Sequence, residues 1–281
     1  MGTLVDDFFA SHEYSESTKM SYRRILDMLI QEADITSWTA SDLLVFVKSK
    51  IKGDEHHNTQ QYISLCACRA FISWRYANHP ALTARIKRTP PKKQRALTMD
   101  QLVQLLALFD TSTEMGARNL ALLSVSIDTG LRRSELARIS VNDIDFPNRK
   151  LQVIVKGGQW GIGIYSQQTA FHIDTWMNLR KPAKGVSSLF LSLRDNRFYG
   201  QGITTHGIKM IFRKWSEIVG FPVSPHDMRR GFATITHLLQ APWKVEKAAG
   251  RWSSDEVMNK YIVEITAEQI RPYLPMANLP K

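Results

Sequence analysis

The amino-acid sequence predicts a mainly α-helical protein with one small β-sheet, divided into two domains. Residues 1–84 carry apolar side chains at helical spacing and lack the alternation that strands show. Residues 85–96 are rich in basic side chains and contain two adjacent prolines, as expected of a linker. Residues 150–166 alternate between apolar and polar side chains and contain glycines, which is typical of a β-hairpin.

The first domain, residues 1–84, is predicted to contain three helices. Apolar residues between positions 20 and 29 recur near helical spacing. Thr39 opens a second helical pattern and Asn58 precedes a third, and both residue types are preferred immediately before the first turn of a helix. We therefore expect a small and entirely helical domain here.

The predicted linker contains six basic residues and no acidic residue between positions 85 and 95. Pro90 and Pro91 disfavour a helix and favour an extended path. A cationic segment of this kind is suited to DNA phosphates, although a solvated connector without a ligand is the alternative. The candidate DNA-binding residues are Arg85, Lys87, Arg88, Lys92, Lys93 and Arg95.

The second domain is predicted to span residues 97–281. Thr98 and Gln101 form a capping-box pattern ahead of an apolar run, which indicates the start of a helix. Helical patterns then cover residues 116–128, residues 132–139 and several short pieces from residue 204 to near Leu274. The predicted hairpin lies between the second and third of these, so helices and a small sheet are expected together.

The composition favours a soluble, cytoplasmic protein with a polyanionic partner. The formal net charge is +11, and an excess of this size is typical of proteins that bind nucleic acid. No apolar run approaches the roughly 20 residues that a membrane-spanning helix needs. Cys66 and Cys68 lie two positions apart in a helical pattern, so their side chains diverge and neither a disulfide nor a metal site is expected.

Five local motifs in the second domain carry the candidate chemistry. His226 and Arg229 are three residues apart, so one face of a helix presents both. Arg132 follows Gly130 at a predicted helix start, where anions are favoured. Each residue alone has an ordinary structural reading, and the order of the set is what is informative. In chain order the set is Arg132, Lys156 before two glycines, His226 with Arg229, Trp252 and Tyr261.

In this order the motifs resemble the tyrosine recombinase (phage integrase) family, in the simple two-domain form of the Xer and Cre enzymes. The stretch from His226 to Thr234 is similar to the His-x-x-Arg box of the family, and Glu135 matches an acidic position that often follows its first arginine. Trp252 is a departure, because most members carry histidine there and a Cre-like subset carries tryptophan. The resemblance covers nearly the whole chain, without the arm-binding domain of lambda-like integrases.

The resemblance implies a site-specific DNA recombinase that works through a 3′-phosphotyrosyl intermediate, without metal, ATP or another cofactor. It implies a SAM-like core-binding fold for residues 1–84 and the catalytic fold for residues 97–281. The expected partner is double-stranded DNA with an inverted-repeat recombination site, and four protomers are expected to assemble on two such sites. Integration, excision and resolution all remain open as the biological event.

The chemistry of each side chain matches a role in this reaction. Guanidinium groups stay charged and can hold two oxygens at once, so Arg132 and Arg229 are suited to the phosphate. The indole of Trp252 can donate one hydrogen bond but cannot titrate. Tyr261 must lose a proton as it attacks, for which His226 is the candidate base, and Lys156 is the candidate acid for the leaving 5′ oxygen.

A short helix is predicted after Tyr261, with Thr266 as its N-cap. Its apolar face would consist of Ile265, Ile270 and Leu274. A helix this short is marginal alone, so this face must dock either on its own domain or on a neighbouring protomer, and the resemblance favours the neighbour.

Two other functions are compatible with the sequence. A type IB topoisomerase shares the chemistry but relaxes DNA without choosing a sequence. A basic DNA-binding protein without catalytic activity would form no covalent adduct with DNA. The helical first domain and the short chain favour the recombinase over the topoisomerase.

Overall fold

The computed structural model describes residues 3–32, 35–53, 58–89, 95–155 and 158–259. The chain divides into two compact units, residues 1–92 and residues 93–281. Each unit has its own hydrophobic core. Among the described residues, no helix combines the length and the apolar character needed to cross a bilayer.

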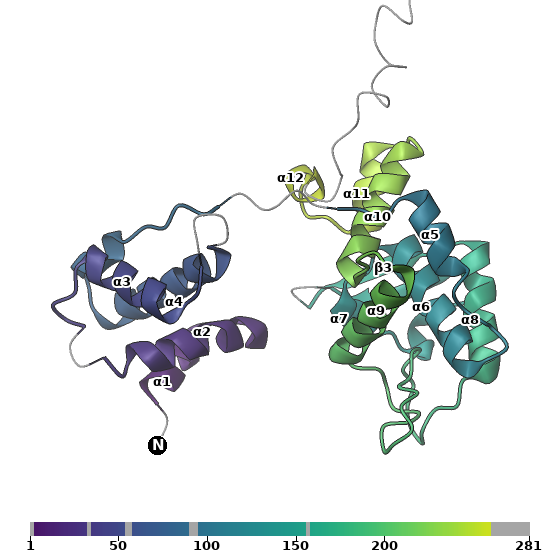
Figure 1. Ribbon diagram of the computed structural model, residues 1–281, viewed down its shortest axis with the longest axis horizontal. Coiled ribbons are helices and arrows are strands. Elements are labelled where there is room, and N and C mark those ends of the chain that lie inside the picture. The colour runs from purple at the N-terminus through teal and green to yellow at the C-terminus, as the bar shows by residue number, and fades with distance from the viewer. Residues whose placement is uncertain (1–2, 33–34, 54–57, 90–94, 156–157, 260–281) are drawn as a thin grey trace, which may run out of the picture. The chain divides into compact units, whose positions relative to one another are not determined.

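The described part of the N-terminal unit is helical (Figure 1). The side chain of Thr39 caps the third helix by accepting a hydrogen bond from the amide of Asp42, as the sequence indicates. The first helix was not predicted, and it buries Phe8 against Phe71 with ring centroids 5.5 Å apart. The elements are α1 (Leu4–Ala10), α2 (Glu16–Leu29), α3 (Ala40–Lys50), α4 (Thr59–Arg75) and the 3-10 turn η1 (Pro80–Thr83).

Helices also dominate the described part of the C-terminal unit (Figure 1). Thr98 and Gln101 form the predicted capping box at the start of the first of them. The helices are α5 (Met99–Leu106), α6 (Glu114–Thr129), α7 (Arg133–Leu136), α8 (Gln167–Leu179), α9 (Thr205–Val219), α10 (Pro225–Leu238), α11 (Trp243–Gly250) and α12 (Asp255–Asn259). The prediction of a mainly helical chain with a small sheet is confirmed.

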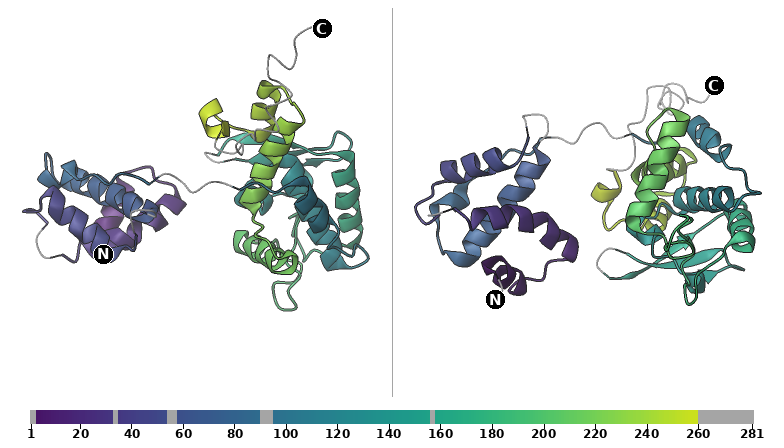
Figure 2. Two further views of the ribbon diagram at one scale, coloured as in Figure 1. Left: turned by 45° about the horizontal axis from the view of Figure 1, so that its top comes forward. Right: turned by 60° about the horizontal axis from the view of Figure 1, so that its bottom comes forward.

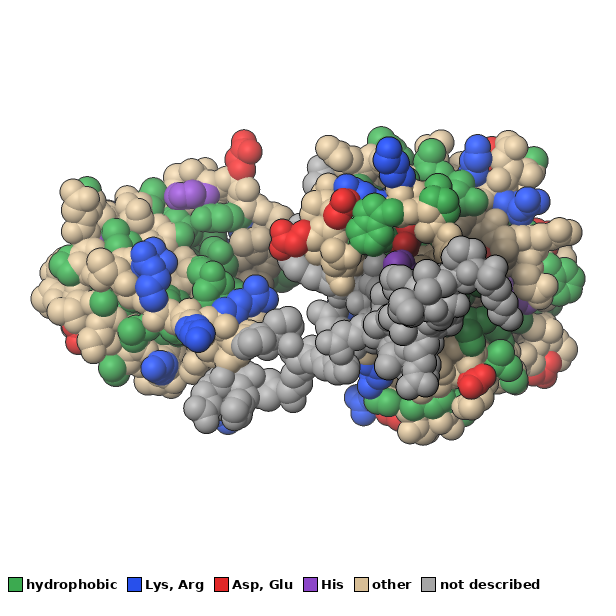
Figure 3. Space-filling view, turned by 90° about the horizontal axis from the view of Figure 1, so that it is seen from above, with side chains coloured by type: hydrophobic (Ala, Val, Ile, Leu, Met, Phe, Trp, Pro, Cys, Tyr) green, Lys and Arg blue, Asp and Glu red, His purple; other side chains and the backbone are tan. Residues whose placement is uncertain are grey.

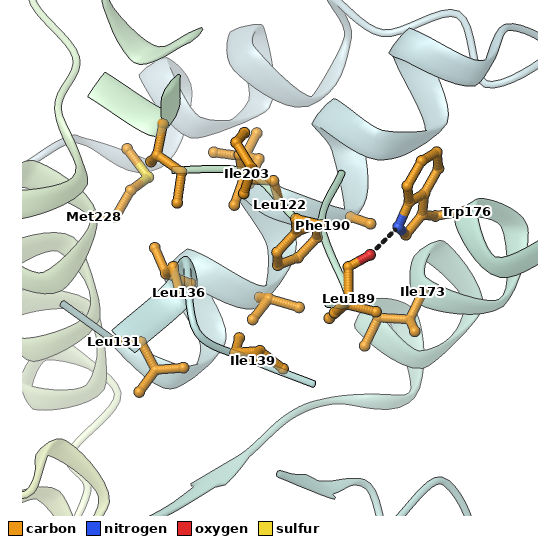
Figure 4. Close-up of a cluster of buried hydrophobic side chains, with 14 of the residues drawn as sticks. Leu122, Leu131, Leu136, Ile139, Ile173, Trp176, Leu189, Phe190, Ile203 and Met228 are labelled. Carbon is orange, nitrogen blue, oxygen red and sulfur yellow. Dashed lines mark hydrogen bonds between the residues drawn. The ribbon is translucent and has the colours of Figure 1, made fainter. Parts of the chain in front are cut away.

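The core of the C-terminal unit is built around α6, which packs against α8 and α10. Leu122 and Leu123 of α6 are fully buried. Trp176 of α8 is also buried and donates its indole N–H to the carbonyl of Leu189 at 2.8 Å (Figure 4). This bond satisfies the one polar atom of the indole, so the large ring can lie inside the core.

The sheet is antiparallel, in the order β1 (Ile144–Asp145), β2 (Lys150–Ile154) and β3 (Trp160–Ile164), and it lies at one edge of the unit (Figure 2). Leu151 pairs with Gly163 and Val153 pairs with Gly161. A Cβ at Gly163 would lie 2.8 Å from Leu151 Cδ1, so glycine is needed for this close packing. The predicted hairpin is confirmed, and β1 is a third strand that was too short to predict.

One predicted helix is much shorter than expected. Helix α7 ends at Leu136, whereas the pattern indicated a helix as far as residue 139. The carbonyl of Ile139 accepts a hydrogen bond from the amide of Leu189 at 2.7 Å, and the amide of Val141 donates to Ser187. The chain after α7 therefore pairs with a distant segment in an extended bridge between Ser140 and Ser188. Helix α8 was not predicted.

Candidate active site

The turn between α6 and α7 presents Arg132. Gly130 ends α6 with φ of +57°, a conformation that glycine adopts without strain. The amide of Arg132 donates to Glu135 Oε2 at 2.8 Å, and Arg132 Nη1 donates to Oε1 at 3.0 Å. The Glu135 side chain is 3% exposed and that of Arg132 is 33% exposed. The buried carboxylate therefore fixes an arginine that still reaches the surface.

Helix α10 presents His226 and Arg229, as their spacing predicted. Ser224 caps this helix and Pro225 occupies its first turn. Arg229 is 1% exposed. Its Nη1 donates to the carbonyl of Gly130 at 2.6 Å, and its Nη2 donates to that of Gly250 at 2.7 Å. Arg229 thus connects, through these two bonds, the segment that precedes Arg132 with the segment that precedes Trp252. The sequence did not predict this structural role.

Trp252 lies directly against this arginine. The guanidinium carbon of Arg229 is 5.0 Å from the centroid of the indole, within the range of a cation–π contact. The indole is 5% exposed, with the ring of Phe232 at 6.1 Å. A Cβ on Gly250 would lie 1.9 Å from the indole, so only glycine can occupy that position. The residues around Trp252 therefore leave room for an indole and pack against it.

A pocket of about 650 Å³ joins three of the candidate catalytic residues, because Arg132, His226 and Arg229 all line it. Further basic side chains that the sequence interpretation missed also line it, namely Arg133 of α7 and Lys209 and Arg213 of α9. Thr205, Lys209 and Arg213 recur every four residues, and this spacing could have shown that α9 turns one face to the pocket. So many cations in one pocket are suited to a phosphate-containing ligand.

Burial lowers the pKa of His226, and the nearby positive charges of Arg230, Arg229 and Arg132 lower it further, against the opposing effect of Asp227. The imidazole is therefore neutral at neutral pH. A neutral imidazole can accept a proton, which is what the candidate base must do.

We expect His226 to titrate below its ordinary value of 6.5 in the DNA-free protein. Its neutral form should persist as the pH falls through 6.5 and be lost only at lower pH. The measurement is an NMR titration of the imidazole signals, assigned by the signal that disappears in His226→Gln. Arg230→Gln should raise the pKa toward 6.5 by removing one positive neighbour. A midpoint above 6.5 in the unmodified protein would contradict this account.

The remaining predicted site residues are only partly within the described chain. Lys156, Tyr261, Lys92, Lys93 and the predicted tail helix lie outside it. Arg85, Lys87 and Arg88 are exposed in the N-terminal unit. Arg95 is exposed as well and lies 3.4 Å from the buried carboxylate of Asp227, the residue after His226.

Basic side chains are visible on the surface of both units (Figure 3). Within the described ranges, no cluster of three or more His, Cys, Asp or Glu side chains could hold a metal ion. Both cysteines are free thiols, Cys66 being half-buried and Cys68 buried.

Comparison with known proteins identifies the class. A sequence model described as the phage integrase family matches residues 95–267. The tyrosine recombinase XerD of Listeria innocua serovar 6a is 26% identical over 265 residues, which cover 85% of this chain and 86% of that protein. The tyrosine recombinase XerC of Serratia marcescens is 25% identical over 244 residues, covering 82% and 77%.

Solved structures have the same fold. The Tn1549 transposon integrase in complex with a circular intermediate DNA aligns with a TM-score of 0.73 and 18% identity, over 99% of this chain and 100% of that one. A lambda integrase dimer bound to a COC′ core site aligns with a TM-score of 0.73 and 15% identity, over 92% and 93%. The family match and the tyrosine recombinase relatives show that the chain is a site-specific DNA recombinase of the tyrosine type. The chain belongs to the phage integrase family.

Proposed function

We propose that this chain cleaves and rejoins double-stranded DNA at a specific inverted-repeat site, with Tyr261 as the nucleophile. The Tyr261 oxygen attacks the phosphorus and forms a 3′-phosphotyrosyl bond, while the bond to the 5′ oxygen breaks. The free 5′ hydroxyl of a second strand then attacks this bond and releases the tyrosine. The energy of the phosphodiester is kept in the covalent intermediate, so rejoining needs no outside energy source.

Each candidate catalytic residue has a separate role in this proposed reaction. Arg132 and Arg229 stabilise the negative charge that gathers on the non-bridging oxygens, and Trp252 donates a further hydrogen bond. His226 takes the proton of Tyr261, and Lys156 gives a proton to the leaving 5′ oxygen. The observation that carries the proposal is the basic pocket lined by Arg132, His226 and Arg229, with Trp252 packed on Arg229.

The test uses a target duplex selected from random-sequence DNA by its binding to the protein. A nick beside the cleaved phosphate turns it into a suicide substrate, because a short fragment diffuses away and rejoining cannot occur. We expect a covalent protein–DNA adduct that survives denaturing electrophoresis. Binding without any adduct would favour the non-catalytic DNA-binding protein.

The same experiment extends to the topoisomerase alternative. A type IB topoisomerase would relax supercoiled plasmids of any sequence. We expect relaxation or recombination only with plasmids that carry the selected target. Equal relaxation of a plasmid without the target would show that the chain does not choose its site.

Two variants of Trp252 separate hydrogen bonding from packing. Trp252→His keeps an N–H donor but loses much of the contact with Phe232, so we expect partial cleavage activity and a lower Tm. Trp252→Phe fills the space better but has no donor, so cleavage should fall on the order of 100-fold. Adduct formation and thermal unfolding are measured on both variants. If activity follows stability instead, the indole acts through packing alone.

We propose that residues 1–84 form the core-binding, SAM-like domain and that this domain and the catalytic domain both bind the DNA. Support comes from the exposed side chains of Arg85, Lys87 and Arg88 beside the segment that joins the two units. Arg95 belongs to the same basic segment, with Lys92 and Lys93 preceding it in the sequence. Phosphate contacts of this kind position a protein on DNA and make binding depend on salt.

The proposed assembly is a homotetramer on two DNA sites, in which the tail after Tyr261 docks on a neighbouring protomer. Deleting residues from Thr266 onward should leave binding to a half-site almost unchanged. The same deletion should weaken cooperative filling of the full site and abolish recombination. A gel-shift titration with half-site and full-site duplexes measures both effects. Unchanged cooperativity in the truncated protein would mean that the tail docks on its own domain.

A further inference from the structure

Arg251 occupies an unusual place between Gly250 and Trp252. Its backbone has φ of +55° and ψ of +44°, the left-handed conformation that favours glycine. Burial lowers the pKa of its guanidinium to about 10, with Arg229 and Arg132 lowering it and Glu135 opposing them. The group is therefore still charged at neutral pH. A strained backbone is costly, and the partly buried side chain loses some of its contact with water, which indicates that the side chain has a specific task.

The contacts of Arg251 reach three separate segments. Its Nη2 donates to the carbonyl of Thr129 at 2.7 Å, at the end of α6 and three residues before Arg132. Its Nη1 donates to the carbonyl of Ile162 of β3 at 3.2 Å and to that of Ala249 at 2.8 Å. Because every partner is a carbonyl oxygen, the guanidinium is directed toward the backbone.

The hairpin is shaped to receive this side chain. A Cβ at Gly161 of β3 would lie 2.9 Å from Arg251 Cδ and 2.9 Å from Val155 Cγ1. Glycine at this position therefore lets the side chain cross the strand and reach Ile162. In the sequence, Lys156 lies between the end of β2 at Ile154 and the start of β3 at Trp160.

We propose that Arg251 is a positioning residue, which holds the β2–β3 hairpin against the turn that presents Arg132. Arg229 bonds to the turn before Arg132 and to the segment before Trp252. Arg251 bonds to the end of α6 and to β3, so it connects the hairpin to the same turn. The hairpin is thereby fixed relative to the arginines that bind the phosphate. This inference rests on the proposed function, in which Lys156 on the hairpin gives a proton to the leaving oxygen.

Arg251→Gly is the main test variant, because glycine adopts the local backbone conformation without strain and only the side chain is lost. Arg251→Lys keeps the charge but has no forked donor group, so it should restore cleavage only in part. Arg180→Gly is the matched control. Arg180 lies at the end of α8 and also donates to backbone carbonyls, those of Ser188 and Val186, outside the candidate site.

Each variant, together with Lys156→Ala, is assayed on an ordinary suicide substrate and on one with a 5′-bridging phosphorothiolate. The thiolate leaving group needs no proton, so its cleavage does not depend on a correctly placed acid. We expect Arg251→Gly to cleave the ordinary substrate about 100-fold more slowly. On the phosphorothiolate, the rate defect of Arg251→Gly should be at least about tenfold smaller than on the ordinary substrate, as it should be for Lys156→Ala. Arg180→Gly should show no such difference between the two substrates.

Normal cleavage by Arg251→Gly, or an equal loss on both substrates while Lys156→Ala is rescued, would overturn the inference. If Lys156→Ala itself is not rescued, the acid assignment fails, and hydrogen exchange of the full-length protein decides the role of Arg251. Exchange in residues 150–154 and 160–165 should then be faster in Arg251→Gly and unchanged in Arg180→Gly. Unchanged exchange of the hairpin in Arg251→Gly would equally overturn the inference.

Discussion

Replacing Tyr261 with phenylalanine is expected to abolish covalent cleavage of DNA while leaving binding to the target duplex unchanged. The substitution removes only the phenolic oxygen, and without that oxygen no phosphotyrosyl bond can form. The basic pocket lined by Arg132, His226 and Arg229 is left intact. Denaturing electrophoresis on the suicide substrate measures the adduct, and a gel shift measures binding.

Tyr199→Phe provides the control for this experiment. Tyr199 belongs to the same unit, is exposed and donates its hydroxyl to Glu114 at 2.7 Å. Its loss should leave adduct formation unchanged. An adduct formed by Tyr261→Phe, or one that disappears in Tyr199→Phe, would assign the nucleophile to another residue.

Replacing Lys156 with alanine is expected to slow cleavage of an ordinary phosphodiester by about 100- to 10,000-fold, the usual contribution of a general acid. The 5′ oxygen would then have to leave without its proton. A 5′-bridging phosphorothiolate has a leaving group that needs no proton, so its cleavage should return. Single-turnover cleavage of the two substrates measures the effect.

Lys150→Ala separates the acid from a general loss of positive charge on the hairpin. Lys150 is an exposed residue of β2. Its removal should affect cleavage of the two substrates equally. If Lys156→Ala is as inactive on the phosphorothiolate as on the ordinary substrate, Lys156 is not the acid.

Much of the fold could be predicted because its signals are local. The capping residues Thr39 and Thr98 lie within three positions of the amides that they satisfy, so they can be read directly from the sequence. The spacing of His226 and Arg229 is local in the same way. The hairpin was predictable because alternation over a few residues describes a strand with one buried face.

The missed features depend on contacts between distant parts of the chain. The chain that follows α7 bonds to a segment about fifty positions away, through Ile139 and Leu189. The role of Arg251 could not be predicted from the sequence, because its partners Thr129 and Ile162 lie 122 and 89 positions earlier. The two carbonyl bonds of Arg229 likewise span 99 and 21 positions. Residue order indicated the candidate catalytic set, but the hydrogen bonds that connect the segments around it required the structure.

The most direct test of the account is to identify the residue that becomes linked to DNA. The unmodified protein is trapped on the suicide substrate, digested with protease and nuclease, and examined by mass spectrometry. We expect one peptide that carries a nucleotide through a phosphotyrosyl bond at Tyr261. A nucleotide on any other residue, or the absence of a linked peptide from a protein that binds and cuts the duplex, would contradict it.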